Sequence, residues 1–138
     1  MISTVDPVIK QLCLASEAPS LLVLEEWINN LCEAFNISEE LYGNILISVT
    51  ESVNNAIIHG NLNQIDKTTI VEYNISESEL SFTVTDQGRG FDFKNVKDPT
   101  EPQNIEQPNG RGIFLMTHLA DKVEYSDPGN KVEITFNL

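Results

Sequence analysis

Hydrophobic residues recur at helical spacing in two segments of the N-terminal half. In the segment 21–35, apolar side chains occur every three or four positions, at Leu21, Leu24, Ile28, Leu31 and Phe35. This period predicts an amphipathic helix, which Asn36 and Ile37 interrupt. A second helix is expected to begin after Ser38, whose hydroxyl can cap the first turn, and to continue to about His59, where Gly60 and Asn61 end it.

The rest of the regular pattern is that of strands. The segment 80–85 alternates strictly, with Leu80, Phe82 and Val84 on one face, and the preceding segment 68–75 is rich in β-branched residues. These two segments predict an antiparallel hairpin with one covered face. Further strands are expected within 8–14, at 122–126 and at 131–136, with a turn at 127–130 between the last two.

A long polar connection at 93–109 contains three prolines and little periodicity. Connections of this length within a small domain are usually functional lids or disordered segments. A short helix at 113–120 is expected to follow it. The resulting order of elements predicts an α+β fold, a two-layer sandwich of helices on one face of a mostly antiparallel, mixed sheet.

Length and composition limit the class of protein. A chain of 138 residues with 41% hydrophobic and 21% charged residues predicts one folded domain spanning 1–138 with a substantial core. The net charge of −13 disfavours direct binding to nucleic acid or to an anionic membrane. Neither a signal peptide nor a membrane-length apolar run occurs in the sequence, so the expected compartment is the cytoplasm.

The cysteines and the cations have simple interpretations. Cys13 and Cys32 lie among apolar residues without metal-ligand spacing, and we expect both to be reduced core residues. Four of the eight cations, Arg89, Lys94, Lys97 and Arg111, fall within residues 89–111. Such a concentration in an acidic protein is typical of an anion-binding region, although chance clustering in a polar loop gives the same pattern.

A polar stripe runs along the second predicted helix, opposite the apolar arc that includes Ile45, Val49 and Val53. The stripe consists of Asn44, Ser48, Glu51, Asn55 and His59. It contains no cation, whereas solvated helix faces usually mix both signs of charge. One interpretation is the lining of a groove that carries chemistry, and the other is a partly buried helix with ordinary polar contacts.

Two glycine-containing segments have possible ligand-binding character. Asp86 ends a predicted strand and is followed by Gly88 and Gly90, which permit positive φ and let a ligand approach the backbone. A carboxylate in this place can accept a hydrogen bond from an exocyclic amine. By itself the pattern is weak, because Asp and Gly are common turn residues.

The second segment, Gly110–Gly112, opens the predicted helix at 113–120. The N-terminus of a helix presents unpaired N–H groups and a positive dipole end, which suit a phosphate. Arg111 would add charge and directional donors. The segment is not a P-loop, which requires Gly-Lys followed by Ser or Thr.

Taken together and in this order, Glu51-x-x-x-Asn55, Asp86-x-Gly88-x-Gly90 and Gly110-x-Gly112 are far more specific. With them the chain resembles the GHKL ATPase superfamily, which has the Bergerat nucleotide-binding fold. Within the superfamily it is most similar to the anti-sigma factor serine/threonine-protein kinases of bacterial partner-switching systems. The resemblance is carried by the segments Glu51–Gly60, Asp86–Asp92 and Gly110–Asp121.

The resemblance implies ATP and Mg²⁺ as cofactors and assigns roles to the site residues. Asn55 would be the Mg²⁺ ligand between the phosphates, and Glu51 would be the catalytic base for the attacking hydroxyl. His59 is expected to cap or pack the helix end. The adenine amino group would bind Asp86 in a pocket shaped by Gly88 and Gly90. The lid hinge and phosphate cradle would contain Gly110, Arg111 and Gly112.

One departure from the family affects the adenine pocket. Many relatives have a Gly-Thr pair at the start of the last strand, and its threonine helps to bind adenine. This chain has Gly129 and Asn130 there, followed by Lys131 and Val132. No adenine contact is therefore assigned to this region, and Thr135 lies too far along the strand to be its replacement.

The function implied by the resemblance is that of a protein serine kinase and anti-sigma factor. Such a protein phosphorylates a serine on an anti-anti-sigma protein with a STAS domain, binds a sigma factor, and forms a homodimer. The alternative is an ATP-binding regulatory module that controls a protein partner without phosphotransfer. A complete sensor histidine kinase is not expected, because the second predicted helix already contains Glu51 and Asn55 and no phosphoacceptor helix pair precedes it.

Overall fold

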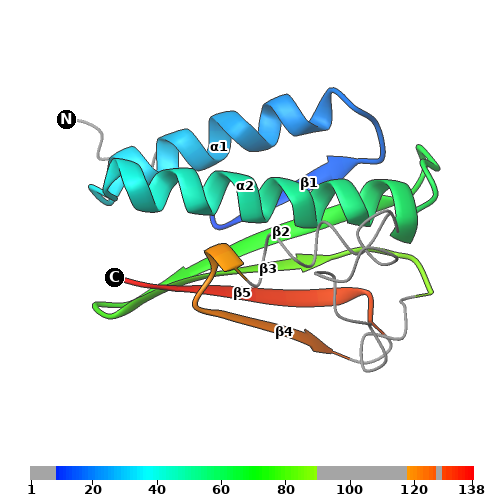
Figure 1. Ribbon diagram of the computed structural model, residues 1–138. Coiled ribbons are helices and arrows are strands. Elements are labelled where there is room, and N and C mark those ends of the chain that lie inside the picture. Colours follow the sequence, from blue (N-terminus) through cyan, green and yellow to red (C-terminus); the bar gives the residue numbers. More distant parts are fainter. Residues whose placement is uncertain (1–8, 90–117, 127–128) are drawn as a thin grey trace.

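A computed structural model describes residues 9–89, 118–126 and 129–138. Figure 1 shows two long helices lying together on one side of a sheet. The described elements are β1 (Gln11–Ala15), α1 (Ser20–Ala34), α2 (Glu39–Asn55), a π-helical turn η2 (Ala56–Gly60), β2 (Thr68–Ile75), β3 (Glu79–Thr85), β4 (Lys122–Ser126) and β5 (Lys131–Asn137).

The sheet has the strand order β1-β2-β3-β5-β4, and its four described ladders are all antiparallel. The central strands β3 and β5 pair from Glu79 with Asn137 to Thr85 with Lys131. Both α1 and α2 cover the same face, so the predicted two-layer α+β fold is confirmed (Figure 1). The strand predicted at 68–75 has the same bounds in the structure, and the first strand begins three residues later than predicted, at Gln11.

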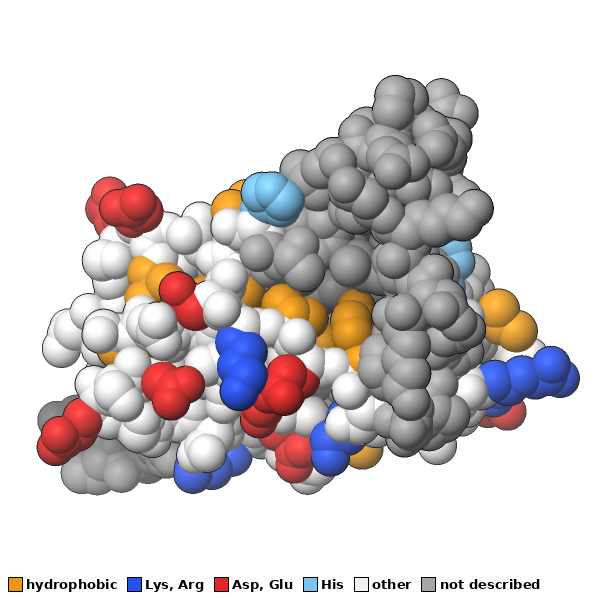
Figure 2. All heavy atoms as spheres, turned by 60° about the horizontal axis from the view of Figure 1, so that its bottom comes forward, with side chains coloured by type: hydrophobic (Ala, Val, Ile, Leu, Met, Phe, Trp, Pro, Cys, Tyr) orange, Lys and Arg blue, Asp and Glu red, His pale blue; other side chains and the backbone are white. Residues whose placement is uncertain are grey.

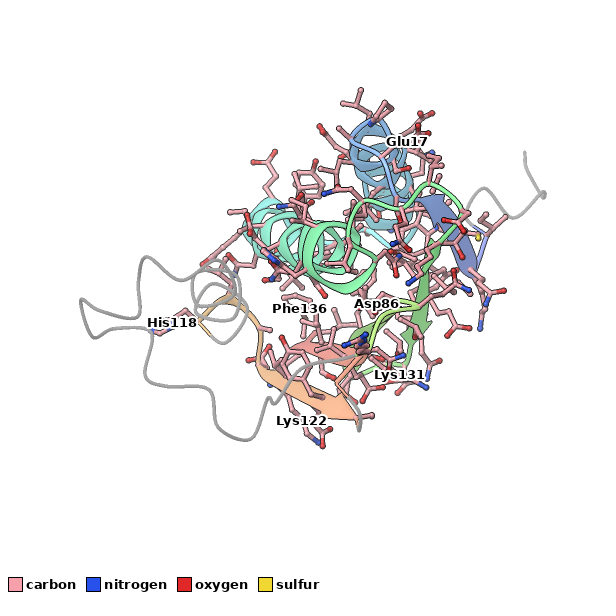
Figure 3. All side chains as sticks on the ribbon, turned by 90° about the vertical axis from the view of Figure 1, so that its right-hand side faces the viewer. Glu17, Asp86, His118, Lys122, Lys131 and Phe136 are labelled. Atoms are coloured by element: carbon pink, nitrogen blue, oxygen red, sulfur yellow. The ribbon has the colours of Figure 1, made fainter. Side chains whose placement is uncertain are left out.

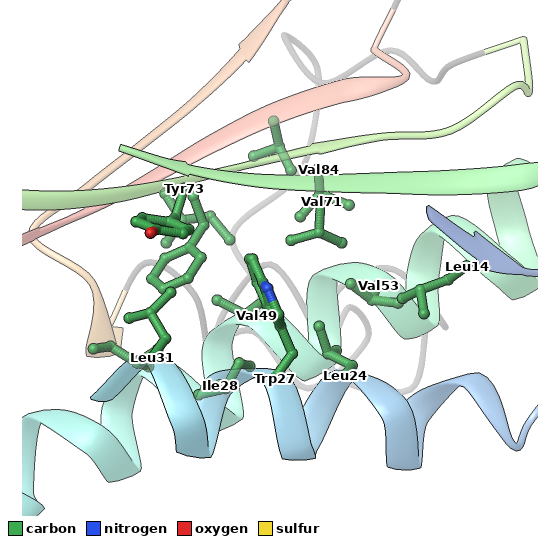
Figure 4. Packing of buried hydrophobic residues seen from close by; sticks show 14 of the residues in the cluster. Leu14, Leu24, Trp27, Ile28, Leu31, Val49, Val53, Val71, Tyr73 and Val84 are labelled. Atoms are coloured by element: carbon green, nitrogen blue, oxygen red, sulfur yellow. The ribbon is translucent and has the colours of Figure 1, made fainter. Parts of the chain in front are cut away.

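The core lies between the helices and the sheet, and the alternation along β3 determines which side chains enter it. Leu80, Phe82 and Val84 are all buried beneath the helices, as predicted. Trp27 of α1 reaches from the helix towards the sheet (Figure 4), with its ring centroid 5.9 Å from that of Tyr73 and 6.1 Å from that of Phe82. Aromatic edge contacts of this kind add to the free energy gained from apolar burial.

The helix boundaries follow from local hydrogen bonding. The α1 helix ends before Asn36, which adopts a positive φ of 53° while the Ile37 N–H donates to the Cys32 carbonyl over 2.9 Å. Ser38 caps α2, because its hydroxyl accepts the Leu41 N–H over 3.2 Å. Both features confirm the boundary predicted between the two helices.

The second helix reaches Gly60, close to the predicted end at His59, but its last turn is not α-helical. From Ala56 onward it is a π turn, in which the Asn61 N–H donates to the Ala56 carbonyl, five residues earlier, over 2.7 Å. Single π turns within helices occur frequently at functional sites. The wider turn accompanies the entry of the Asn61 side chain into the interior, where it is fully buried.

The opposite face of the sheet is polar. Figure 2, which brings the bottom of Figure 1 forward, shows acidic and basic side chains interspersed over this side. Lys122 and Glu124 of β4 form an exposed ion pair of 3.1 Å, which contributes little stability in water. Cys13 is exposed, contrary to the prediction that it is a core residue, because the alternation of β1 turns Leu14 towards the helices and Cys13 away from them.

Cys32 is a buried free thiol, as predicted, and its burial raises the pKa to about 11. The loop predicted at 93–109 lies outside the described residues, as does most of the helix predicted at 113–120, of which His118 and Leu119 are described as helical. Among the described helices none is both long and apolar enough to cross a membrane.

Candidate functional site

Asp86 follows β3 and lies where the sheet meets the end of the second helix (Figure 3). Its carboxylate Oδ1 accepts the Gly88 N–H over 2.7 Å. The other carboxylate oxygen faces the backbone of Gly60, where an added Cβ atom would lie 2.4 Å from Oδ2. The fold therefore brings together two segments that are 26 residues apart, and it places the predicted adenine-binding carboxylate against the last residue of η2.

The two glycines near Asp86 are required for close packing. A Cβ atom on Gly88 would lie 2.1 Å from the Gly60 carbonyl oxygen, so the two backbones are in contact. Among the described glycines only Gly129 has a positive φ, of 100°. Positive φ is therefore not the reason for a glycine at position 88, and close backbone approach is the reason that the structure supports.

The Asp86 carboxylate is a hydrogen-bond acceptor that is only partly hydrated, because it is partly buried. Burial raises the pKa of the carboxyl group, while the Gly88 N–H and the positive charge of Lys67 oppose that shift. The group thus combines a hydrogen-bonded oxygen, partial burial and a nearby cation. Few water molecules compete with an exocyclic amine that donates a hydrogen bond to such a carboxylate.

Glu51 and Asn55 lie one turn apart on the same face of α2, and both side chains are half-buried. Their carboxylate and amide oxygens are the kinds of ligand that Mg²⁺ accepts. The described residues contain no group of three or more His, Cys, Asp or Glu side chains that could hold a metal. The donor set therefore fits a cation that would take most of its ligands from phosphate and water.

The rest of the predicted stripe does not form one continuous polar surface. Ser48 is fully buried, and its hydroxyl has no hydrogen-bond partner within the described ranges. Asn44 is half-buried, and His59 is exposed in the last turn of η2. Ser48 was predicted to lie on the polar stripe, either as groove lining or as ordinary helix surface, but it is buried beside Ile45 and Val49 and is no part of an exposed polar face. The expectation that His59 packs against the helix end is not supported by its exposed side chain.

Of the remaining predicted residues, one belongs to the described part of the chain. This residue is Arg89, from the predicted cluster of cations, and its side chain is exposed three residues after Asp86. Four further positions lie outside the described residues, namely Gly90, Gly110, Arg111 and Gly112.

Two asparagines beside Asp86 were not identified as site residues from the sequence. The Asn61 amide is buried and forms hydrogen bonds on both its nitrogen and its oxygen, one of them to Gln87. Asn130 exchanges two hydrogen bonds with the backbone of Asp86, over 2.9 and 3.1 Å. The sequence offers only an indirect signal for them: Asn61 follows the helix-ending glycine, and Asn130 stands where relatives have the threonine of the Gly-Thr pair.

The two-layer α+β fold, with Asp86 at a strand end beside the helix that carries Asn55, is compatible with a nucleotide-binding domain of the histidine kinase type. The chain belongs to this family: the model of the histidine kinase-like ATPase domain matches residues 14–136. It is thus an ATP-binding domain in class, and the predicted resemblance is confirmed.

Individual relatives carry regulatory names. The chain is 36% identical over 91 residues to the anti-sigma F factor of Clostridium perfringens strain SM101, a match covering 63% of this chain and 64% of the relative. It is 31% identical over 96 residues to the serine-protein kinase RsbW of Bacillus cereus strain ATCC 10987, covering 64% of this chain and 59% of the relative. The matches thus span slightly less than two thirds of these relatives.

Proposed function

We propose that this chain is an ATP-dependent protein serine kinase and anti-sigma factor of a bacterial partner-switching system. The observation that carries the proposal is the contact between Gly60 and Asp86. The Asp86 carboxylate lies at one end of a helix that carries Asn55 about one turn earlier and Glu51 about two turns earlier. Base recognition, cation ligation and proton transfer can then act on one nucleotide.

The roles follow from the chemistry of each group. The Asp86 carboxylate accepts a hydrogen bond from the adenine amino group. The Asn55 amide oxygen would hold Mg²⁺, and the metal would supply positive charge against the phosphates. The Glu51 carboxylate accepts the proton of the attacking serine hydroxyl. The resemblance also proposes Gly90 for the adenine pocket and Gly110, Arg111 and Gly112 for the phosphate cradle, although these four residues lie outside the described part of the chain.

The partners are proposed from the names of the relatives. Anti-sigma F factor and serine-protein kinase RsbW are names of proteins that inhibit a sigma factor or phosphorylate a protein serine. By analogy, this chain would bind a sigma factor, phosphorylate a serine on a STAS-domain antagonist and act as a homodimer. None of these partners requires a nucleic-acid or membrane contact, which fits the net charge of −13.

The test is transfer of labelled γ-phosphate from ATP to a purified STAS-domain partner. Glu51→Ala should still bind ATP but lose transfer by at least about 100-fold, because general-base catalysis typically contributes factors of this size. The matched control is Glu40→Ala, which removes an exposed carboxylate from the first turn of the same helix and should keep full transfer.

The result would separate two functions. Full transfer by Glu51→Ala would refute the proposed base. Absence of transfer by the unmodified chain, with partner binding that still depends on ATP, would instead establish the regulatory module without phosphotransfer.

A further inference from the structure

We propose that Asn61 and Asn130 are positioning residues that aim the Asp86 carboxylate by holding one peptide group from both sides. The proposal rests on the proposed role of Asp86 in adenine binding. The peptide group joins Asp86 to Gln87. Its N–H, on Gln87, donates to Asn61 Oδ1 over 2.8 Å, and its carbonyl, on Asp86, accepts from Asn130 Nδ2 over 3.1 Å.

This peptide group lies just beyond the regular sheet. The ladder between β3 and β5 ends at Thr85 and Lys131, and the Asp86 N–H extends it by one bond to the Asn130 carbonyl over 2.9 Å. In the next peptide group the partners are side chains, because the ladders that join β3 to β2 and to β5 both end at Thr85. Two amides therefore replace the ladder at the position where the direction of Asp86 is set.

The orientation of the Asn61 amide is determined by its surroundings. Its Nδ2 donates to the Thr68 carbonyl and the Ser16 hydroxyl, each over 3.1 Å, and to the Thr69 hydroxyl over 3.3 Å. A carbonyl can only accept and the Gln87 N–H can only donate, so the amide oxygen must face Gln87. Asn61 is fully buried, and loss of the bond to the Gln87 N–H would leave its buried Oδ1 without its hydrogen-bond partner among the described residues.

A second bond supports the same segment. The Gln87 side chain returns to β2, where its Oε1 accepts the Thr68 N–H over 2.7 Å. The start of β2 therefore contacts both Asn61 and Gln87. This arrangement anchors the backbone after Asp86 to an element that belongs to the sheet.

The hydrogen bonds of Asn61 and Asn130 form a clamp on this peptide group, and the clamp has a consequence for the direction of the carboxylate. Rotation of the Asp86–Gln87 peptide group would change the backbone torsions on both sides of it and move the Gly88 N–H away from Asp86 Oδ1. The carboxylate would then lose its fixed direction although its charge remained. A pre-organised acceptor binds an amine more tightly than a mobile one, because less conformational freedom is lost on binding.

A ligand pair isolates this effect from general damage to the site. ATP and purine riboside 5′-triphosphate differ in the 6-amino group, which only the first possesses. Dissociation constants for both would be measured by calorimetry with the full chain and Mg²⁺. We expect Asn61→Ala and Asn130→Ala each to lower the preference for ATP over the analogue by about 10-fold, the range of one hydrogen bond to a charged group.

A loss of site structure alone would weaken both ligands equally and leave the preference unchanged. The matched control is Asn74→Ala, which removes an exposed amide from β2 and should leave the preference as it is. Thermal unfolding identifies any variant that does not fold. Asn130 is only half-buried, so Asn130→Ala decides the question if the buried Asn61→Ala fails to fold.

Asp86→Ala distinguishes failure of this inference from failure of the proposed site. If Asp86→Ala removes the preference for ATP and the folded asparagine variants keep it, the positioning role is overturned while the adenine site stands. If Asp86→Ala keeps the preference, the carboxylate does not read the amino group, and both the site and the clamp are refuted.

Discussion

Substitution of Gly60 by alanine tests the contact on which the site depends. In the structure a Cβ atom at this position would lie 2.4 Å from Asp86 Oδ2, 2.5 Å from Cγ and 2.7 Å from Oδ1. The carboxylate cannot simply withdraw, because Oδ1 accepts the Gly88 N–H and the Asp86 backbone is bonded to Asn130. Gly60→Ala must therefore displace either the carboxylate or the last turn of η2.

The size of the effect follows from the overlap. Non-bonded heavy atoms prefer separations of about 3.5 Å, so the two groups must move apart by roughly 1 Å. Overpacking of this kind costs about 1–3 kcal/mol, while alanine in a helical turn regains up to about 1 kcal/mol over glycine. We expect a net loss of roughly 1–2 kcal/mol in the free energy of unfolding. ATP affinity should fall by about 10- to 100-fold, because a hydrogen bond to a charged carboxylate is misdirected.

The chain offers a matched control in Gly43, which lies within α2 and has no atom within 4 Å of an added Cβ. Gly43→Ala should raise the free energy of unfolding by about 1 kcal/mol and leave ATP affinity unchanged. Gly88→Ala is the reciprocal test, because its Cβ would lie 2.1 Å from the Gly60 carbonyl oxygen. It should be more damaging than Gly60→Ala, since a backbone atom has less room to move than a carboxylate.

The assays are urea denaturation for the free energy of unfolding and calorimetry for ATP binding. The reasoning would be refuted if Gly60→Ala behaved like Gly43→Ala in both. A loss of stability with unchanged ATP affinity would show that the strain is relieved without moving Asp86, and the proposed role of the carboxylate would then lack its main structural support.

Three further substitutions have clear expectations. Burial raises the pKa of Asp86, so the folded state binds its proton more tightly than the unfolded chain, and ionisation lowers stability above the usual pKa of about 4. Asp86→Asn should therefore unfold at higher denaturant concentration than the wild type at pH 7, and this difference should vanish in acid. The substitution should also abolish ATP binding. Equal stability of the two proteins at pH 7 would contradict the reasoning. Ser38→Ala removes the cap on Leu41 and should cost about 1 kcal/mol in urea denaturation, whereas no loss would show that the cap is dispensable. Ser48→Ala removes a buried hydroxyl that has no partner in the described part of the chain, and thermal unfolding should show unchanged or higher stability rather than a loss.

The regular elements could be predicted because their signals are local. The alternation of Leu80, Phe82 and Val84 identifies both the strand and the face that the helices cover. The Ser38 cap could be predicted because the hydrogen bond that it accepts comes from Leu41, only three residues later. The π turn after Asn55 could not be predicted, because Ala56–Gly60 continues an ordinary helical pattern and the wider turn accompanies contacts of Asn61 with distant residues.

Of the predicted site, the described structure brings Asp86, Gly88 and the helix end at Gly60 into contact. Of the two reasons inferred for Gly88, positive φ is wrong, and the structure supports close approach of its backbone to that of Gly60. The roles of Glu51 and Asn55 stay predictions that rest on their shared helix face.

The sequence by itself determined the order of the described elements, the buried face of β3 and the family to which the chain belongs. These properties depend on residue period and on motifs that are short in sequence. Only the tertiary structure decided that Ser48 is buried, that Cys13 is exposed and that Asn61 and Asn130 hold the peptide group after Asp86. Hydrogen bonds that span 26 and 44 residues leave no periodic trace, because they depend on where the packed helices and sheet bring the chain together.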